Sequence, residues 1–269
     1  MWTKKLAAMF VVALMFFSAA SSAFAENGWD WEKGVVRVTG VAGFQWNQNN
    51  RGSFWRNHVR QGARIDALRN LVETIGGVIV EKQQDTMVIT CLDDNIITKT
   101  VSRGAHLVDT KFYEDGTCEV TMEIPIFGKN SAAEAIFSLA KENPKKNFPK
   151  PTAKVNLGNE TYTGLIVDCR NLNIERTLTP VIKVDKDFVI YGKEFLGYNK
   201  IFDKVVNQGM AEYTTDINSQ TRAGLKPLTV KAFGKDKDNI VISNEDADKI
   251  LTANKKFHFL DNCAVVIVY

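Results

Sequence analysis

Histidine, proline and cysteine are scarce in this sequence, and the motifs of several enzyme classes are missing. Its 269 residues include three histidines, six prolines and four cysteines. His58, His106 and His258 lie far apart and belong to no metal-site pattern, so a structural role is favoured for each. No CxxC, HExxH, GxSxG, Walker loop or GxGxxG occurs. The sequence therefore predicts no catalytic, cofactor-binding or metal-binding residue.

The chain also lacks an excess of charge of one sign. Its 34 Lys and Arg residues nearly balance 31 Asp and Glu residues, which gives a net charge of +3. Loss of the two lysines among the first 25 residues would lower this to +1. A chain this close to neutral gives no general reason to expect a nucleic acid partner. After residue 25 no apolar run approaches the roughly 20 residues of a membrane-spanning helix, so no span is expected there.

The first 25 residues have the three parts of a secretory signal peptide. Lys4-Lys5 is a short basic start, Leu6 to Phe17 is an apolar core, and Ala23-Phe24-Ala25 is a small-x-small cleavage pattern before Glu26. The sequence therefore predicts export, with cleavage after residue 25, to the periplasm or the outer envelope. Because the first cysteine is Cys91, no cysteine at the cleavage site could carry a lipid anchor.

The four cysteines allow two interpretations. An even number in an oxidising compartment permits disulfides, and the pairs Cys91–Cys118 and Cys169–Cys263 would keep one bond in each half of the chain. The alternative is that all four are buried free thiols. The sequence leaves both open.

Residues 58–80 carry the strongest pattern of secondary structure in the first half. Apolar residues recur every four positions, as on the buried face of a helix: Val59, Ala63, Ala67, Leu71 and Ile75. Gly76-Gly77 is predicted to end this helix, and Val78–Val80 is predicted to begin a strand.

Shorter patterns complete the first half. Residues 35–41 and 86–92 read as strands, and 96–102 as a short helix. Residues 105–113 and 117–127 read as two strands joined by an Asp-Gly hairpin turn. Ser131 and Glu134 form a capping box for a helix over 132–142.

A change of composition at 142–151 divides the chain. This segment holds three of the six prolines and three lysines, which favours an irregular, solvated linker. The predicted organisation is a signal peptide (1–25), a first domain (26–143), a linker (144–160) and a second domain (161–269).

The second domain alternates apolar runs with polar segments. Residues 162–169 suit a buried central strand, and 228–232 and 240–242 suit further strands. Helices are expected over 200–208 and over 244–253, the second capped by Ser243. The apolar run 263–269 must pair inside a sheet to avoid aggregation. The predicted fold class is α+β: two small domains, each a mostly antiparallel sheet with packed helices.

The order of segments in the first half resembles a known family. The matching residues are GVVRVTGVA (34–42), ARIDALRNLVETIGGVIV (63–80), DDNIITKTVSRGA (93–105) and DGTCEVTMEIPI (115–126). They are similar to the domain of the bacterial twenty-kilodalton envelope lipoprotein family, found also at the front of the flagellar assembly protein T. The resemblance implies a helix packed on an antiparallel sheet, an envelope location and a non-enzymatic role. In several relatives that role is connected with flagella or the outer membrane.

Two stretches are candidate sites. The loop 44–57 carries Phe44, Trp46, Phe54 and Trp55, which could contact a ligand or partner or else pack on the nearby core. Asp168-Cys169-Arg170 could hold an activated thiolate if His106 or His258 came near, or could be a strand end whose charged residues cap the loop. Calcium is disfavoured, because the Asp-rich turns at 185–187 and 236–238 lack the EF-hand spacing.

We expect a non-enzymatic secreted protein that acts in structural assembly of the envelope, with flagellar or outer-membrane proteins or further copies of itself as partners. Sheet edges are the expected docking surfaces. The alternatives are a module that binds a small ligand or envelope polymer through the 44–55 aromatics, and a thiol hydrolase centred on Cys169.

Overall fold

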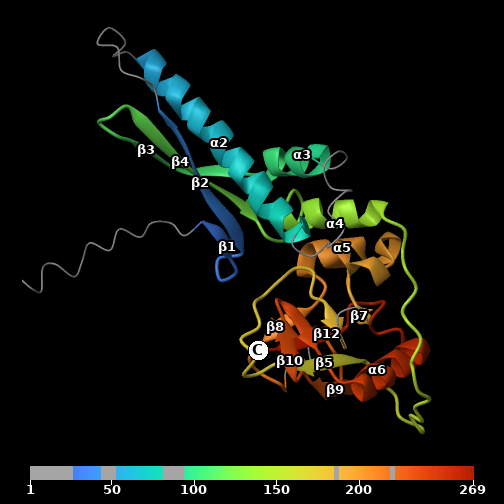
Figure 1. The fold of residues 1–269 in the computed structure, drawn as a ribbon. Coiled ribbons are helices and arrows are strands. Elements are labelled where there is room, and N and C mark those ends of the chain that lie inside the picture. Colours follow the sequence, from blue (N-terminus) through green and yellow to red (C-terminus); the bar gives the residue numbers. More distant parts are fainter. Residues whose placement is uncertain (1–26, 44–52, 81–93, 185–187, 219–221) are drawn as a thin grey trace, which may run out of the picture.

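The computed structural model describes residues 27–43, 53–80, 94–184, 188–218 and 222–269 (Figure 1). They form an N-terminal half built on one antiparallel sheet and a C-terminal half built on two sheets of shorter strands. Helices and sheets are segregated rather than regularly alternating in the N-terminal half, so the predicted α+β class is confirmed. None of the described helices is long and apolar enough to cross a membrane.

The N-terminal sheet has four antiparallel strands in the order β1-β2-β4-β3. The strands are β1 (Gly28–Asp30), β2 (Val35–Gly43), β3 (His106–Phe112) and β4 (Thr117–Pro125). The hairpin predicted between β3 and β4 is confirmed. Gly116 in its turn has a φ of 90°, and the backbone N–H of Thr117 donates to Oδ1 of Asp115 at 2.8 Å. Glycine takes this positive φ without strain, which is why the Asp-Gly pair marks the turn.

Helix α2 (Ser53–Val80) lies across β2 and β4 and buries the stripe that the sequence predicts. The helix and strand approach closely because small residues face each other. A Cβ added to Gly40 on β2 would lie 2.1 Å from the backbone N of Ala67, closer than any real contact. The five stripe residues are at most 4% exposed: Val59, Ala63, Ala67, Leu71 and Ile75.

The predicted end of this helix is wrong. Helix α2 begins at Ser53 and continues through Gly76 and Gly77 to Val80, where a strand was expected. Neither glycine takes a positive φ, so the pair does not form the left-handed cap that the prediction assumed. Two glycines cost a helix about 1 kcal/mol each relative to alanine, a local penalty that the rest of a 28-residue helix can outweigh. The strand expected over 86–92 lies outside the described residues.

Two shorter helices follow the expected positions. Helix α3 (Asp94–Gly104) precedes β3, and α4 (Ala132–Glu142) follows β4. The capping box of α4 is confirmed, because Oγ of Ser131 accepts a hydrogen bond from the backbone N–H of Glu134 at 3.1 Å. The Glu134 carboxylate in turn accepts one from the backbone N–H of Asn130.

The C-terminal half contains two four-stranded sheets. One has the order β8-β12-β5-β9 and is parallel throughout: β8 (Glu212–Thr214), β12 (Val265–Val268), β5 (Gly164–Asp168) and β9 (Pro227–Lys231). The other is mixed, in the order β10-β11-β6-β7: β10 (Gly234–Asp236), β11 (Asn239–Val241), β6 (Ile182–Lys183) and β7 (Val189–Tyr191). The C-terminal half also contains a 3-10 turn, η1 (Lys193–Phe195), and the helices α5 (Tyr198–Gln208) and α6 (Asn244–Phe257).

The predicted fold omits one of the two C-terminal sheets. A mostly antiparallel sheet is predicted in each half, and the sheet β10-β11-β6-β7 fits this, with two antiparallel pairings and one parallel pairing. The sheet β8-β12-β5-β9, which is parallel throughout, is not predicted. The two central strands, β5 and β12, are apolar along almost their whole length and buried on both faces, as is usual in parallel sheets. The prediction that the C-terminal run pairs inside a sheet is confirmed, because β12 lies between β8 and β5.

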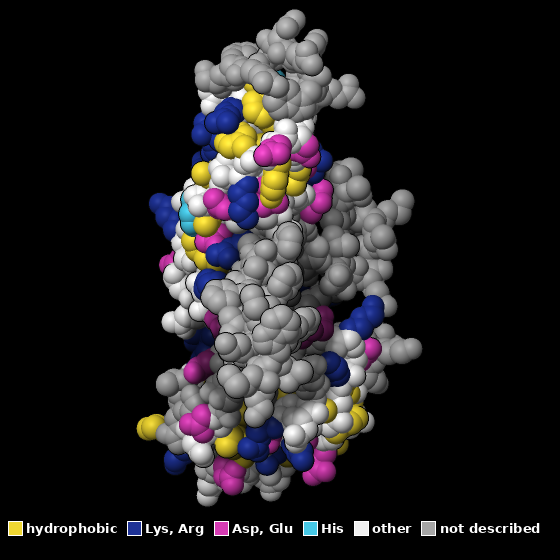
Figure 2. All heavy atoms as spheres, turned by 90° about the vertical axis from the view of Figure 1, so that its left-hand side faces the viewer, with side chains coloured by type: hydrophobic (Ala, Val, Ile, Leu, Met, Phe, Trp, Pro, Cys, Tyr) yellow, Lys and Arg dark blue, Asp and Glu magenta, His cyan; other side chains and the backbone are white. Residues whose placement is uncertain are grey.

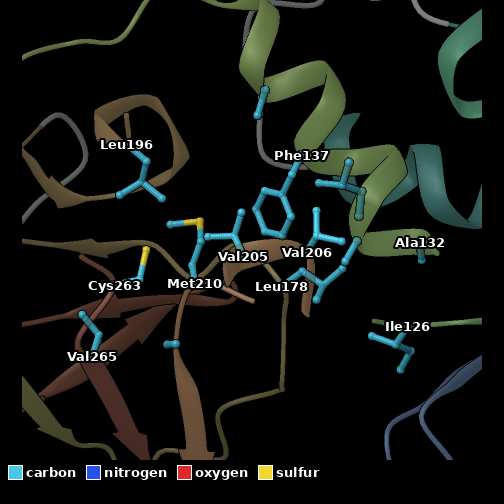
Figure 3. Packing of buried hydrophobic residues seen from close by; sticks show 14 of the residues in the cluster. Ile126, Ala132, Phe137, Leu178, Leu196, Val205, Val206, Met210, Cys263 and Val265 are labelled. Atoms are coloured by element: carbon cyan, nitrogen blue, oxygen red, sulfur yellow. The ribbon is translucent and has the colours of Figure 1, made fainter. Parts of the chain in front are cut away.

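The two halves share one buried core where α4 packs against α5 (Figure 1). Phe137 of α4 points toward Val205 and Val206 of α5, with Leu178 and Met210 beside them (Figure 3). The ring centroids of Phe137 and Tyr198 are 6.0 Å apart, within the range of a favourable aromatic pair. The backbone N–H of Gly128 also donates across this seam to the carbonyl of Val206 at 3.0 Å.

Residues 144–160 are irregular, as predicted, and so are 161–163, where the strand was predicted to begin; the whole segment contacts the C-terminal half. The backbone N–H of Lys146 donates to the carbonyl of Glu194, and the Phe148 ring stacks on Phe195 at 5.2 Å. Further along, the carboxylate of Asp248 on α6 accepts hydrogen bonds from the backbone and the hydroxyl of Thr152 at 2.6 and 2.8 Å. The segment remains largely exposed, as in a solvated linker, but these contacts hold it as a strap along the C-terminal half.

Asp248 should stabilise the fold in a pH-dependent way. Burial raises its pKa, but hydrogen bonds from Thr152 and from the backbone of Ala153 outweigh burial and leave the pKa below its ordinary value. Its contribution is therefore present above the unfolded pKa and is lost as the pH falls through the lowered folded pKa. We expect Asp248→Asn to lower the free energy of unfolding by about 1–3 kcal/mol at pH 7.

This prediction is checked by urea unfolding followed by circular dichroism at pH 7 and at pH 3. Asp203→Asn is the matched control, because Asp203 is an exposed carboxylate on the other helix of this half. The difference between Asp248→Asn and the wild type should shrink at pH 3. Equal stability of the two proteins at pH 7 would contradict the account of the strap.

Candidate functional site

The outer edge of β3 is the most exposed part of the N-terminal sheet. Strand β3 is last in the order β1-β2-β4-β3, and no described strand pairs with its outer side. Six of its seven residues are exposed. Four large apolar side chains there, which we call the β3 patch, are 39–48% exposed: Leu107, Val108, Phe112 and Tyr113. Figure 2 shows hydrophobic side chains exposed among charged ones on the side of the molecule that carries the β3–β4 hairpin.

The patch exists because the described helices do not extend fully over β3. Leu107 is paired with Met122 of β4, and Phe112 is paired with Cys118. Met122 and Cys118 are fully buried under the helices, and paired residues share one face of a sheet. Leu107 and Phe112 therefore point to the helix side of the sheet, yet they remain 48% and 39% exposed.

Charged residues and a bulge accompany the apolar side chains. The ladder shifts register between Leu107 and Asp109, which marks a β-bulge. On the face away from the helices, Lys111 lies 3.6 Å from Glu119 and 3.8 Å from Asp109. Bulges and edge charges are the usual means by which proteins prevent indiscriminate pairing of an open edge. These features disfavour edge-to-edge pairing of β3.

One polar atom in this strand has no hydrogen-bond partner among the described residues. Thr110 lies between Leu107 and Phe112 in the sequence of the strand. Its hydroxyl is buried, and no described residue forms a hydrogen bond with it. An unsatisfied buried hydroxyl costs about 1–3 kcal/mol.

Of the four aromatic residues predicted to contact a ligand, one can be placed. Phe44 and Trp46 lie outside the described residues, and Phe54 is in the first turn of α2 with a side chain that is not described. Trp55 is half-buried, and its ring lies 6.5 Å from that of Phe112. Trp55 thus packs on its own sheet at one end of the β3 patch, so it does not support the pocket that the aromatic loop was expected to line.

The predicted disulfide pairing is wrong for the C-terminal half. Cys118, Cys169 and Cys263 are free and buried in the structure, so Cys169–Cys263 is not formed. Cys118 is also unpaired, while Cys91 lies outside the described residues. The alternative interpretation, buried free thiols, holds for these three cysteines.

The structure does not assemble a thiol active site around Cys169. Cys169 follows the carboxyl end of β5, whereas His258 and its neighbour Asp261, 3.5 Å apart, precede the amino end of β12. Because β5 and β12 are parallel, these positions lie at opposite ends of the sheet, about 10 Å or more apart. His106 is on β3 in the other half, 3.9 Å from Glu123.

The electrostatics of Cys169 agree with this geometry. Burial raises the pKa of its thiol to about 12, and the neighbouring Asp168 carboxylate adds to the shift. Asp168 instead accepts hydrogen bonds from the backbone and guanidinium of Arg170, as expected for a capped strand end. Among the described residues, no group of three His, Cys, Asp or Glu side chains is placed to hold a metal ion.

One feature of the sequence indicates that part of β3 is exposed. Apolar residues occupy adjacent positions at 107–108 and again at 112–113, so they cannot all point to one buried face of a regular strand. The bulge and the end of the strand resolve this conflict by leaving them at the surface.

A family model described as the second domain of Treponema pallidum Tp0624 matches residues 164–269. The match runs from the first residue of β5 to the last residue of the chain and covers less than half of the sequence. The C-terminal half is therefore similar to that domain, and the description of the family states no activity. No curated protein matches the chain.

The buried state of Cys169 predicts its reactivity. We expect iodoacetamide to leave Cys169 unmodified in the native protein at pH 8 and to modify it fully in urea, because a thiol with a pKa of about 12 is almost entirely protonated at that pH. Peptide mass spectrometry after alkylation measures the modified fraction. Rapid modification of Cys169 in the native protein at pH 7 would contradict this expectation and would support the alternative that Cys169 is an activated thiolate.

Proposed function

We propose that this protein is a non-enzymatic component of the cell envelope that acts in structural assembly by binding another envelope protein. The observation that carries the proposal is the β3 patch, a set of exposed apolar side chains on and next to an open sheet edge. The signal-peptide pattern at residues 1–25 supports an exported protein. The resemblance of the first half to the envelope lipoprotein family directs the proposal to flagellar or outer-membrane assemblies.

The chemistry of the edge favours a partner that adds an extended strand. A strand paired with β3 would satisfy the outward backbone N–H and C=O groups, as in other β-augmentation complexes. Its apolar side chains would cover Leu107 and Phe112. Lys111 and Asp109 on the opposite face would select the register by charge.

Removing one apolar contact from this edge tests the proposal. Wild-type protein and the variant Leu107→Lys are tagged, crosslinked in cell envelopes and purified, and the attached proteins are identified by mass spectrometry. We expect envelope proteins with the wild type and about fivefold lower recovery with Leu107→Lys, because an edge lysine disfavours strand pairing.

Leu225→Lys is the matched control, since Leu225 is 80% exposed and lies in the C-terminal half. This variant should recover the same partners as the wild type. Recovery of no other envelope protein, or only of further copies of this chain, would contradict the proposal. Undiminished recovery with Leu107→Lys would contradict the docking edge.

A further inference from the structure

A second surface feature lies at the carboxyl end of the parallel sheet, in the other half of the molecule. A pocket of about 260 Å³ opens there between the ends of β5 and β9, lined by Asp168, Arg170, Asn171 and Lys231. Asp168 and Lys231 are paired in the sheet, so their side chains share one face. Ligands of open parallel sheets commonly bind beyond the carboxyl ends of the strands, which is where this pocket lies.

A tight turn after β5 holds one wall of the pocket. The backbone N–H of Leu172 donates to the carbonyl of Cys169 at 3.0 Å, and Asn171 between them takes a φ of 75°. Asparagine is among the residues that tolerate this left-handed conformation best. The turn brings the Arg170 guanidinium back onto Asp168, with Nε 2.9 Å from Oδ1 and Nη2 2.7 Å from Oδ2.

This arrangement leaves a positive charge in the pocket. Both oxygens of Asp168 are engaged by Arg170, and hydrogen bonds from Arg170 keep the pKa of that carboxyl below its ordinary value. The two charges therefore compensate each other. The ammonium group of Lys231 is exposed. Its charge helps to lower the pKa of Asp168, but no hydrogen bond or salt bridge joins Lys231 to a described residue. The lining side chains thus carry one uncompensated positive charge.

An exposed aromatic ring lies next to this charge. Lys231 and Phe233 flank Ala232, which is 3% exposed and donates its backbone N–H to the carbonyl of Asp168 at 2.9 Å. Although β9 ends at Lys231, burial still alternates beyond it, with Ala232 buried and Phe233 exposed, so Lys231 and Phe233 are both on the solvent side. The Phe233 side chain is 67% exposed, so its ring is available for a contact with a ligand.

We propose that this pocket binds a small organic carboxylate whose charged group lies against Lys231 and Arg170 and whose apolar group lies on Phe233. The single uncompensated charge matches a monoanion. A dianion such as phosphate would leave one charge unneutralised beside the Asp168 carboxylate. The same chemistry occurs in a free organic acid and in the C-terminal carboxylate of a peptide, and the experiment distinguishes these sources.

The test is a titration of the mature protein, labelled with ¹⁵N, with sodium phenylacetate, followed by amide NMR. We expect saturable shifts of the amides of residues 168–172 and 231–233 with a dissociation constant in the millimolar range. Benzyl alcohol lacks the charge, acetate lacks the ring, and inorganic phosphate carries more than one charge at pH 7.5, so all three should bind more weakly. Binding of a peptide that ends in Gly-Phe is compared with binding of the same peptide carrying a C-terminal amide, which tests whether the carboxylate belongs to a peptide C-terminus.

Two variants locate the site. Lys231→Gln should weaken phenylacetate binding about fivefold, the effect of losing one exposed ion pair of about 1 kcal/mol. Lys226→Gln is the matched control, because Lys226 is an exposed lysine just before the opposite end of β9. Shifts elsewhere in the protein, equal binding by Lys231→Gln, or no saturable shifts would each overturn the proposal.

Discussion

The packing of α4 against α5 is the contact on which the arrangement of this molecule depends. It joins an antiparallel sheet with its long helix to a parallel sheet with its own helices, and it does so through fully buried side chains such as Phe137 and Val205. Truncation of a buried phenylalanine typically costs about 3–5 kcal/mol, a large part of the stability of a domain. The seam therefore acts as part of the core rather than as a contact between separate domains.

The seam joins the two halves that carry the two candidate surfaces. The β3 patch belongs to the sheet on one side of the seam, and the pocket at Asp168 and Lys231 belongs to the sheet on the other side. The strap adds hydrogen bonds from Thr152 to Asp248 along the C-terminal half.

Local patterns in the sequence predicted local structure well. The stripe on α2, the Asp-Gly hairpin and the caps at Ser131 and Ser243 each depend on residues a few positions apart, so their chemistry can be read directly. Contacts between distant residues could not be read in this way. The parallel pairing of β5 with β12, the shared core and the binding of the strap join segments tens of residues apart, and no short-range pattern specifies them. The exposure of the β3 patch could not be predicted either, because it depends on how far helices from other parts of the sequence extend over β3.

The measurement that tests the central claim most directly is the order in which buried thiols become reactive in increasing urea. Cys118 reports on the N-terminal sheet, and Cys169 and Cys263 report on the C-terminal half. All three side chains are at most 1% exposed in the native state. A single core predicts that the three thiols become reactive at one urea concentration, together with the change in tryptophan fluorescence. Exposure of Cys169 and Cys263 at a urea concentration at which Cys118 is still protected, or the reverse order, would contradict the account.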